Sequence, residues 1–359
     1  MLDWTSALYL GMRHAHRTLR PWRQLTTGRP AALDHGSSAT AVAAQLARLQ
    51  GCDRSLLAPS TLHAFWDVFG MIDRRQTAIY VDAGVYPIAR WGVERAAAQG
   101  VHTRRFPHYT VAALREAIGE DRLGRAPLVV ADGVCPGCGR VAPLAAYRDI
   151  VRAHGGQLVI DDTQALGILG DGPSATNAYG SGGGGSLRWS GAHDPRIVVI
   201  ASLAKAFGVP ITVLAGSADW VQHVEEHSET RVHCSPPSIA SFRAAAQALA
   251  INHLRGELLR ARLLHRVRYF RQALAAAGLR ATGGIFPVQT IDCDGMDAAW
   301  LYEHLRRRGI HTILHRARGD GGGRLSLIIT ALHRRDAIDQ TVEALAQLAA
   351  SAVQRQLWR

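Results

Sequence analysis

Lys205 is the one lysine among the 41 lysine and arginine residues of this 359-residue chain. Arginine can replace lysine on a surface or in an ion pair, but a guanidinium stays protonated and is a poor nucleophile. A chain that uses arginine everywhere else and keeps one amine therefore points to amine chemistry at that position. The leading candidate is an imine, formed with a carbonyl substrate or with pyridoxal phosphate (PLP). The alternative is a composition bias toward arginine that spared one lysine by chance.

The residues around Lys205 predict a strand that runs into a tight turn. Residues 196–200 (RIVVI) are mostly β-branched, which is typical of strands buried on both faces of a parallel sheet. Lys205 follows the carboxyl end of this strand, where α/β sheets place their ligands. Ser202 can offer a hydroxyl and a backbone N–H to a phosphate, and Gly208 lets the chain turn close by.

Two other places predict groups for the same crevice. Residues 157–162 (QLVIDD) read as a strand with Asp161 at its carboxyl end, so Asp161 and Lys205 should face one another. Ser60 and Thr61 precede an apolar helical stretch at residues 64–72. Hydroxyl groups at a helix start suit a bound anion, and an ordinary helix cap is the alternative.

Alternating strands and helices predict an α/β fold with a large, mostly parallel sheet. Beyond about residue 238 the pattern changes to a long arginine-rich helix and then a smaller α+β region. We expect an N-terminal arm at 1–37, a large domain at 38–250 and a small C-terminal domain at 251–359. Gly182 to Gly185 match no phosphate-loop spacing and predict a flexible surface loop. The strands are expected at 77–82, 128–132, 157–162, 196–200, 286–291 and 324–329.

Composition narrows the class of protein. Apolar residues make up 47% and charged residues 19%, as in a soluble globular protein, and the net charge is +12. The arginines are spread along the chain without a nucleic-acid-binding motif, so we do not expect a nucleic-acid partner. A basic mouth that attracts a phosphate, a carboxylate or an acyl-thioester carrier fits the charge better.

The chain has five cysteines, an odd number, so we do not expect a disulfide framework. Cys135-Pro136-Gly137-Cys138 has no second ligand pair, so a turn is favoured over a metal or redox site, and we expect no metal. The N-terminus lacks the features of a signal peptide and no apolar run is long enough for a membrane span, which predicts a cytoplasmic protein.

Five segments, in order, resemble the fold-type I PLP enzymes, and within them the α-oxoamine synthases. This family includes 8-amino-7-oxononanoate synthase, 2-amino-3-ketobutyrate CoA ligase and serine palmitoyltransferase. The resemblance covers nearly the whole chain and implies the PLP-dependent transferase fold, PLP as cofactor and a homodimer. The segments are DWTSALYLGM (3–12), DGV with VAPL (132–134 and 141–144), VIDDTQALG (159–167), ASLAKAFG (201–208) and TALH (330–333).

The resemblance assigns roles by position. Lys205 would bind PLP covalently and then move the α-proton, and Asp161 would keep the pyridine nitrogen protonated. Ser60, Thr61 and Leu62 occupy the position of the family's phosphate cup, with a further phosphate contact from Ser202. His233 or Cys234 lies where the partner subunit reaches the phosphate in this family.

Several positions depart from the family. Tyr86 aligns with the histidine that stacks on the cofactor ring, and Gln164 with a histidine near the phenolic oxygen. Tyrosine can still stack, and glutamine can still donate a hydrogen bond. Ser326 aligns with the arginine that holds the substrate carboxylate, and Arg324, two residues away on the same strand face, can take its place.

Three functions remain open at this point. The first is condensation of an amino acid with an acyl thioester, on CoA or on an acyl carrier protein. The second is amino transfer on the same scaffold, which Tyr86 favours. The third is a non-catalytic protein with this fold, against which the retained Lys205 and Asp161 argue.

Overall fold

The computed structural model describes residues 1–34, 36–293, 297–315 and 323–357, and the chain packs into two compact units. The large unit consists of Met12–Cys135 and Val141–Gly256. The small unit consists of Met1–Gly11, Pro136–Arg140 and Glu257–Arg359. The division between 256 and 257 falls inside helix α9 (Ile239–Ala276). The predicted domain boundaries at residues 37 and 250 stay predictions.

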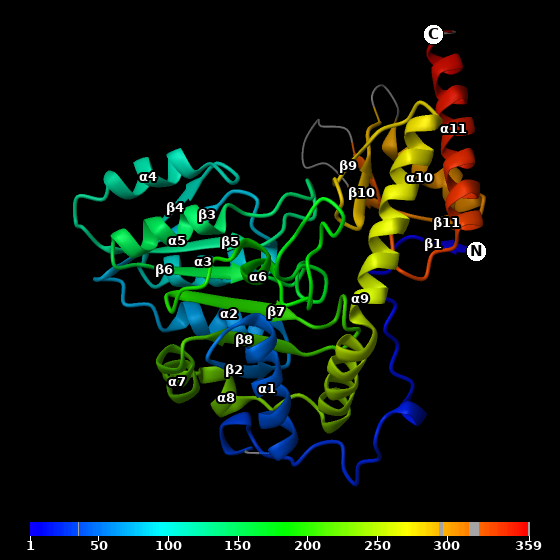
Figure 1. The fold of residues 1–359 in the computed structure, drawn as a ribbon. Helices are drawn as coiled ribbons and strands as arrows, with labels where there is room; N and C mark the ends of the chain where they lie inside the picture. The colour runs from blue at the N-terminus through cyan, green and yellow to red at the C-terminus, as the bar shows by residue number, and fades with distance from the viewer. Residues whose placement is uncertain (35, 294–296, 316–322, 358–359) are drawn as a thin grey trace. The chain divides into compact units, whose positions relative to one another are not determined.

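A seven-stranded sheet forms the centre of the large unit, in the order β2-β8-β7-β6-β5-β3-β4 (Figure 1). The five strands from β7 to β4 in this order pair in parallel, and β8 is antiparallel to both of its neighbours, β7 and β2. The mostly parallel sheet predicted from the sequence is confirmed. Its strands are β2 (Arg54–Ala58), β3 (Thr77–Asp82), β4 (His102–Phe106), β5 (Ala126–Asp132), β6 (Gln157–Asp161), β7 (Ile197–Ser202) and β8 (Thr212–Gly216).

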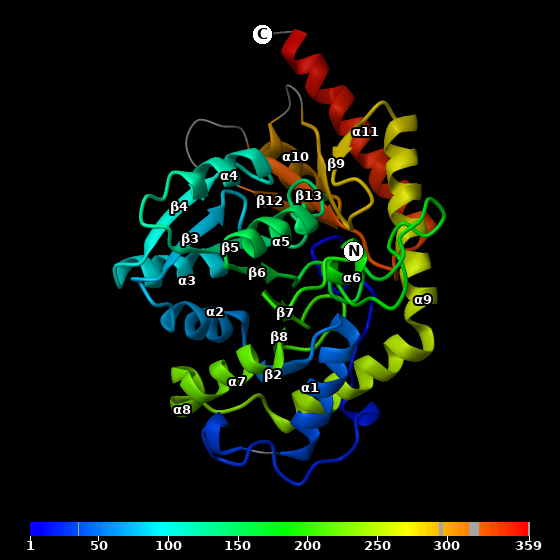
Figure 2. The same ribbon diagram turned by 60° about the vertical axis from the view of Figure 1, so that its left-hand side comes forward.

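Helices cover both faces of this sheet, because the sheet strands are apolar on both sides (Figure 2). One core joins α4, α5 and α6 to the sheet around Leu114, Tyr147 and Leu187. The other joins α2, α3 and α7 to the opposite face around Phe65 and Val93. The helices of this unit are α1 (Ser37–Gln50), α2 (Thr61–Gly70), α3 (Pro87–Ala98), α4 (Val111–Gly119), α5 (Leu144–Ala153), α6 (Ser186–Ser190), α7 (Ala218–His227), α8 (Glu229–His233) and the first part of α9.

The small unit is an antiparallel sheet packed with helices, in the strand order β12-β13-β10-β9. The first residues of the chain belong to it: β1 (Leu2–Asp3) pairs in parallel with β11, and Trp4 stacks on His333 with ring centroids 4.0 Å apart. The other elements are β9 (Ala281–Thr282), β10 (Val288–Ile291), α10 (Ala298–Arg307), β11 (Ile310–His311), β12 (Ile313–His315), β13 (Arg324–Ile328) and α11 (Arg335–Leu357).

The prediction of a flexible surface loop at residues 182–185 is wrong for its last three glycines, which are buried. Gly183 accepts a hydrogen bond from the N–H of Gly167, and Gly185 donates one to Leu169 at 2.7 Å. The neighbouring backbone can approach Gly183 and Gly185 this closely because glycine has no side chain. A Cβ on Gly185 would overlap the Asp162 carboxylate.

We expect Gly185→Ala to destabilise the protein much more than Gly182→Ala. Both residues have positive φ, +97° and +86°, so both substitutions carry the same backbone strain of about 1–2 kcal/mol. Only Gly185 faces Asp162, whereas nothing lies within 4 Å of a Cβ on Gly182. Overlap in a packed core adds about 1–3 kcal/mol. Thermal unfolding should therefore show a clearly lower midpoint for Gly185→Ala, and equal midpoints would contradict the packing described here.

Candidate active site

Neighbouring strands of the large unit end in acidic residues at one edge of the sheet. Asp82, Asp132 and Asp161 are the last residues of β3, β5 and β6, and Lys205 follows the end of β7. These four strands are consecutive in the sheet and parallel, so their carboxyl ends meet at the same edge. The three carboxyl groups are almost fully buried. The edge therefore concentrates charge in a place from which water is largely removed.

One cavity at this edge brings together half of the predicted site residues. Asp161 and Lys205 face it, as the strand-end argument requires. All of the lining belongs to the large unit. The lining consists of Lys205, Asp161, Gln164, Tyr86, Thr61, Thr163 and Asp132, of which the last two were not predicted.

The charges in this cavity shift one another. Burial lowers the pKa of the Lys205 amine below its ordinary value, and Asp161 and Asp132 counter part of that shift. Burial also raises the pKa of Asp161, and hydrogen bonds from Thr163 reduce the size of that rise. Burial raises the pKa of Asp132 well above the ordinary value, and the charge of Asp161 adds to the rise. The amine is thus easier to deprotonate, as a nucleophile and base must be.

Thr163 ties the ends of β6 and β7 together. Its backbone N–H donates to Asp161 Oδ1 at 3.0 Å, and its hydroxyl oxygen accepts the N–H of Ser202 at 3.0 Å. The Ser202 hydroxyl in turn accepts the N–H of Ala204 at 3.2 Å. This chain of bonds fixes the carboxylate of Asp161 relative to the turn that carries Lys205.

The predicted phosphate cup lies at the start of α2. Ser60 is the N-cap residue, and its hydroxyl lies 2.8 Å from Nδ1 of His63 instead of capping the helix. The N–H groups of the first helical turn have no partners within the helix, which suits an anion. Thr61 also lines the cavity, whereas Leu62 is exposed.

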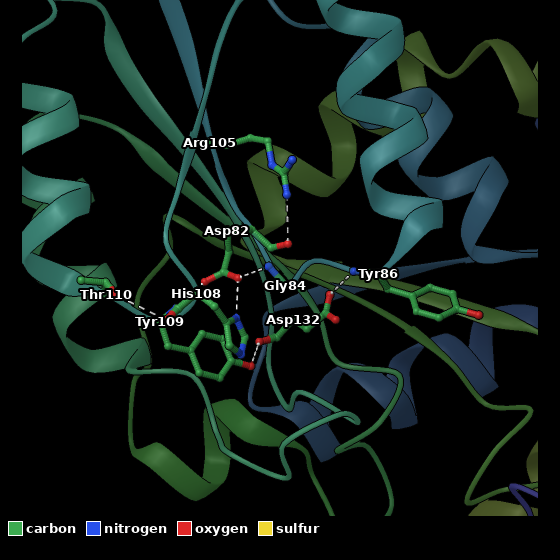
Figure 3. Close-up of polar contacts among 9 residues, drawn as sticks. Asp82, Gly84, Tyr86, Arg105, His108, Tyr109, Thr110 and Asp132 are labelled. Carbon is green, nitrogen blue, oxygen red and sulfur yellow. Dashed lines mark hydrogen bonds and ion pairs between the residues drawn. The ribbon is translucent and has the colours of Figure 1, made fainter. Parts of the chain in front are cut away.

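Asp82 organises the turn that carries Tyr86 (Figure 3). Its carboxylate accepts the N–H of Gly84 at 2.7 Å, the N–H of Tyr109 at 2.7 Å and the ring N–H of His108 at 2.6 Å. Three donors on one buried carboxylate stabilise its charge. Because Gly84 stands two residues before Tyr86, the bond holds the chain where it leaves β3.

Asp132 connects this turn to the cavity. Its side chain accepts the N–H of Tyr86 at 3.2 Å, and its carbonyl accepts the hydroxyl of Tyr109 at 2.8 Å (Figure 3). Tyr109 has φ of 55°, the one positive value outside glycine among the described residues. Such backbone strain persists where surrounding contacts hold it. These contacts place Asp132, Tyr86 and Asp82 in one hydrogen-bonded network.

The predicted site residues that do not line the cavity are Ser60, Leu62, Ser202, His233 and Arg324. His233, the last residue of α8, is an exposed residue of the large unit. Arg324, the first residue of β13, is exposed in the small unit. Ser326 is buried on the same strand, with its hydroxyl 2.7 Å from that of Thr290 and 3.0 Å from Nε2 of His315. The roles of His233 and Arg324 stay proposals.

The turn predicted at Cys135-Pro136-Gly137-Cys138 is confirmed. A bridge between Val134 and Val141 closes it, and neither cysteine is in a disulfide. None of the described helices combines the length and the apolar composition that a membrane crossing requires.

The fold and the buried amine at its sheet edge define a PLP-dependent enzyme of fold type I. Residues 35–345 match the aminotransferase class I and II family, and the chain belongs to it. Enzymes of this family depend on PLP.

Within this class the chain belongs to the α-oxoamine synthase family. It is 31% identical to the 8-amino-7-oxononanoate synthase of Chromohalobacter salexigens over 84% of this chain and 75% of that protein. Identity to the corresponding synthase of Alkalilimnicola ehrlichii is also 31%, over 71% of this chain and 63% of that protein, so the matched region spans less than two thirds of that relative.

Solved structures show the same fold at lower identity. The serine palmitoyltransferase of Sphingomonas wittichii superposes with a TM-score of 0.83 at 17% identity, covering 97% of this chain and 86% of that one. The 8-amino-7-oxononanoate synthase of Francisella tularensis superposes with a TM-score of 0.73 at 17% identity, covering 98% of each chain. The fold predicted from the sequence is therefore confirmed.

The cavity residues fit PLP. Lys205 provides the amine, and a pyridinium nitrogen would give the buried carboxylate of Asp161 the cationic partner that such a group needs. The first turn of α2 provides backbone N–H groups for a phosphate, and Tyr86 offers an aromatic face. Each part of the cofactor thus has a chemically matched residue.

We expect Asp132→Asn to stabilise the cofactor-free protein at high pH and not at low pH. The pKa of Asp132 is raised in the folded chain, so folding favours its protonated form. The stability linked to this proton is present below the unfolded pKa of about 3.9 and is lost as pH rises through the folded value. Asparagine carries no charge and can still accept the N–H of Tyr86.

The measurement is the thermal midpoint of the apo-protein at about pH 4.5 and about pH 8. The increase in thermal midpoint of Asp132→Asn relative to the native chain should be larger at the higher pH. Glu116→Gln removes an exposed carboxyl on α4 and serves as the control. An equal gain at both pH values would mean that Asp132 is not a destabilising buried charge.

Proposed function

We propose that this protein is an acyltransferase of the α-oxoamine synthase type, which condenses an amino-acid-derived carbanion with an acyl thioester. The observation that carries the proposal is the single lysine of the chain, Lys205, in one cavity with the buried carboxyl of Asp161. The 31% identity to an 8-amino-7-oxononanoate synthase over 84% of the chain supports this reaction type.

PLP supplies an electron sink that stabilises a carbanion at the substrate's α-carbon. Lys205 would hold the cofactor and, once released from it, would accept the α-proton of the amino acid, for which its lowered pKa prepares it. Asp161 would keep a proton on the ring nitrogen, and the bond from the Thr163 N–H fixes the orientation of its carboxylate. Tyr86 and Gln164 line the same cavity, where Tyr86 would offer its ring for stacking on the cofactor and Gln164 would donate a hydrogen bond to the cofactor's phenolic oxygen.

The phosphate would be held at the start of α2, by Ser60, Thr61 and the N–H of Leu62, with Ser202 as a further donor. The phosphate would take no part in the reaction and would serve as the anchor of the cofactor in this cavity.

The protein is proposed to act as a homodimer, in which His233 of one subunit reaches the phosphate bound by the other. Exposed apolar side chains support an interface on α2 and α3: Trp66 is 43%, Trp91 49% and Tyr86 50% exposed. Val232, beside His233, is 52% exposed. Apolar groups gathered in this way on a surface favour a protein–protein contact.

Amino transfer is the second candidate, because Tyr86 lines the cavity and aligns with the position at which α-oxoamine synthases have a histidine. For that reaction Lys205 would move the α-proton onto the cofactor, and no thioester would be needed. The two reactions release different products, a free thiol in one and a keto acid in the other.

The test is a panel of amino acids, each incubated with the purified holoenzyme in the presence and absence of acyl-CoA or an acyl carrier protein. A synthase releases thiol only when both substrates are present, and Lys205→Arg, which keeps the charge without the nucleophile, should release none. Keto acid released without any acyl donor would show an aminotransferase instead.

Arg324 is proposed to hold the carboxylate of the amino acid, in place of the family arginine that aligns with Ser326. Arg324→Ala should raise the KM of the accepted amino acid about tenfold or more, since a charge-assisted bidentate contact is lost. The KM of Arg324→Lys should lie between those of the native enzyme and Arg324→Ala, because lysine keeps the charge but cannot make the bidentate contact of a guanidinium. An unchanged KM in both variants would remove Arg324 from the substrate site and indicate an amine or another carboxylate contact.

A further inference from the structure

His108, Cys135 and Cys138 bring three possible metal-ligating atoms close together. A ring nitrogen of His108 and the two sulfur atoms all lie within 4.8 Å of one another. Among the residues that the structure describes, no other three histidine, cysteine or acidic side chains are grouped in this way. All three side chains are partly exposed, so an ion from solvent can reach them. None of them lines the cavity of Lys205, and the mechanism above makes no use of them.

The topology of the sheet explains how the three residues meet. β4 and β5 lie on either side of β3 and run parallel to it, so the chain leaves all three strands at the same edge. His108 follows the end of β4, and Cys135 begins the turn after β5. We expected no metal from the sequence because the cysteine pair lacked further ligands nearby, whereas the third ligand stands on a different loop.

The two cysteines belong to a tight turn that is closed at its base. A bridge joins Val134 to Val141, and both of these residues belong to the large unit. Gly139 has φ of +71°, a left-handed conformation that folds the backbone back directly after Cys138. The spacing C-x-x-C is that of cysteine pairs that bind one Zn²⁺ in structural zinc sites. The local geometry of the turn therefore suits two sulfur ligands to one ion.

Asp82 orients the imidazole of His108. The buried Asp82 carboxylate accepts the Nδ1–H of His108 at 2.6 Å (Figure 3). An ionised carboxylate can only accept, so Nδ1 carries the proton, and a neutral ring then has its lone pair on Nε2. Metal-bound histidines almost always donate their other N–H to such a partner, which fixes the ring and makes the ligating nitrogen more basic. The ring also stacks on Tyr109, with centroids 3.8 Å apart.

The ligand types select the class of metal ion. Mg²⁺ and Ca²⁺ take oxygen ligands, and thiolates do not suit them. Zn²⁺ is bound tetrahedrally by cysteine and histidine, and sites with three protein ligands keep the fourth position for water. Two thiolates also balance the charge of a divalent ion. A Cys-Cys-His set with a carboxylate behind the histidine therefore fits Zn²⁺.

We propose that His108, Cys135 and Cys138 bind one Zn²⁺ ion, whose fourth position is taken by water. The ion ties the loop after β4 to the turn after β5. Through His108 and Asp82 it also holds the turn that carries Tyr86. Its role is to fix this turn and not to take part in the reaction, so the proposal is independent of whether the enzyme transfers acyl or amino groups.

The first test uses Co²⁺ as a probe, because in a tetrahedral thiolate site this ion replaces Zn²⁺ and gives d–d absorption bands outside the absorption of PLP. The PLP-loaded protein is reduced, freed of metal with a chelator and titrated with Co²⁺. We expect the bands to saturate at a single Co²⁺ per chain and to disappear when Zn²⁺ is added, since a tetrahedral thiolate site favours Zn²⁺. Absence of these bands in the reduced native protein would overturn the proposal.

Loss of a ligand should weaken this binding. Cys135→Ser/Cys138→Ser should abolish the Co²⁺ bands. His108→Gln should raise the dissociation constant for Co²⁺ at least about tenfold, since even the loss of an outer partner of a ligand costs about 10–100-fold. Bands that persist at native affinity in either variant would show that Co²⁺ binds elsewhere and would overturn the proposal.

The matched controls keep the three ligands. Cys52→Ser/Cys293→Ser removes the same number of thiols, and His102→Gln removes an exposed histidine of β4. Both should bind Co²⁺ within about twofold of the native protein, because neither removes a ligand atom. A loss in these controls equal to that of the ligand variants would mean that the effect is not specific to the proposed site.

A second measurement uses only the native chain and does not depend on whether a variant folds. The reduced protein is alkylated with and without Zn²⁺, and the modified peptides are mapped by mass spectrometry. Zn²⁺ should slow the alkylation of Cys135 and Cys138 about tenfold or more and leave Cys293 unchanged, because a thiolate bound to a metal is no longer a free nucleophile. Equal protection of Cys293, or no protection of the pair, would contradict the site.

A third measurement tests the role of the ion by amide hydrogen exchange. Zn²⁺ should slow exchange in the peptide that contains Gly84 and Tyr86, since a bound ion that fixes His108 and Asp82 also reduces local opening of this turn. The same peptide of Cys135→Ser/Cys138→Ser should not respond to Zn²⁺. Exchange that Zn²⁺ leaves unchanged in the native chain would refute the proposed hold on the Tyr86 turn.

Discussion

Burying a charged amine costs free energy unless an opposite charge compensates it, and at Lys205 that compensation comes from Asp161 and Asp132. The sheet explains how the three groups meet: β5, β6 and β7 are parallel neighbours that end at one edge. Helices on both faces remove water from the strands, which shifts all three pKa values toward the neutral forms. The fold thus sets the acid–base chemistry of the site.

Hydrogen bonds also fix the backbone of the strand ends and turns around this site. Thr163 links the strand of Asp161 to the turn of Lys205, and Asp82 fixes the turn of Tyr86 through three donors. Both Thr163 and Asp82 accept main-chain N–H groups, so small movements of the strands would misplace the ring-binding residues. Positioning of this kind contributes to catalysis because reacting groups must meet within a few tenths of an ångström.

The sequence alone predicted the parallel sheet, the strand-end placement of Asp161 and Lys205, and the fold type. Strand patterns are local signals and the single lysine is a count over the sequence, so neither needs knowledge of tertiary contacts. Asp132 could have been found the same way, because it ends a predicted strand just as Asp161 does. The partnership of Asp82 with His108 joins residues from different elements, and no spacing in the sequence reveals it. The buried glycines at residues 183–185 were missed because composition does not distinguish a flexible loop from one packed against Asp162.

The most direct measurement is the intact mass of the protein after it is incubated with PLP and reduced with borohydride, followed by peptide mapping. Because Lys205 is the only lysine side chain, the account predicts one reduced PLP adduct, on the peptide that contains Lys205, and none on Lys205→Arg. A native chain that acquires no adduct, or acquires it only at the N-terminal amine, would contradict the central claim that this buried amine is the cofactor's attachment point.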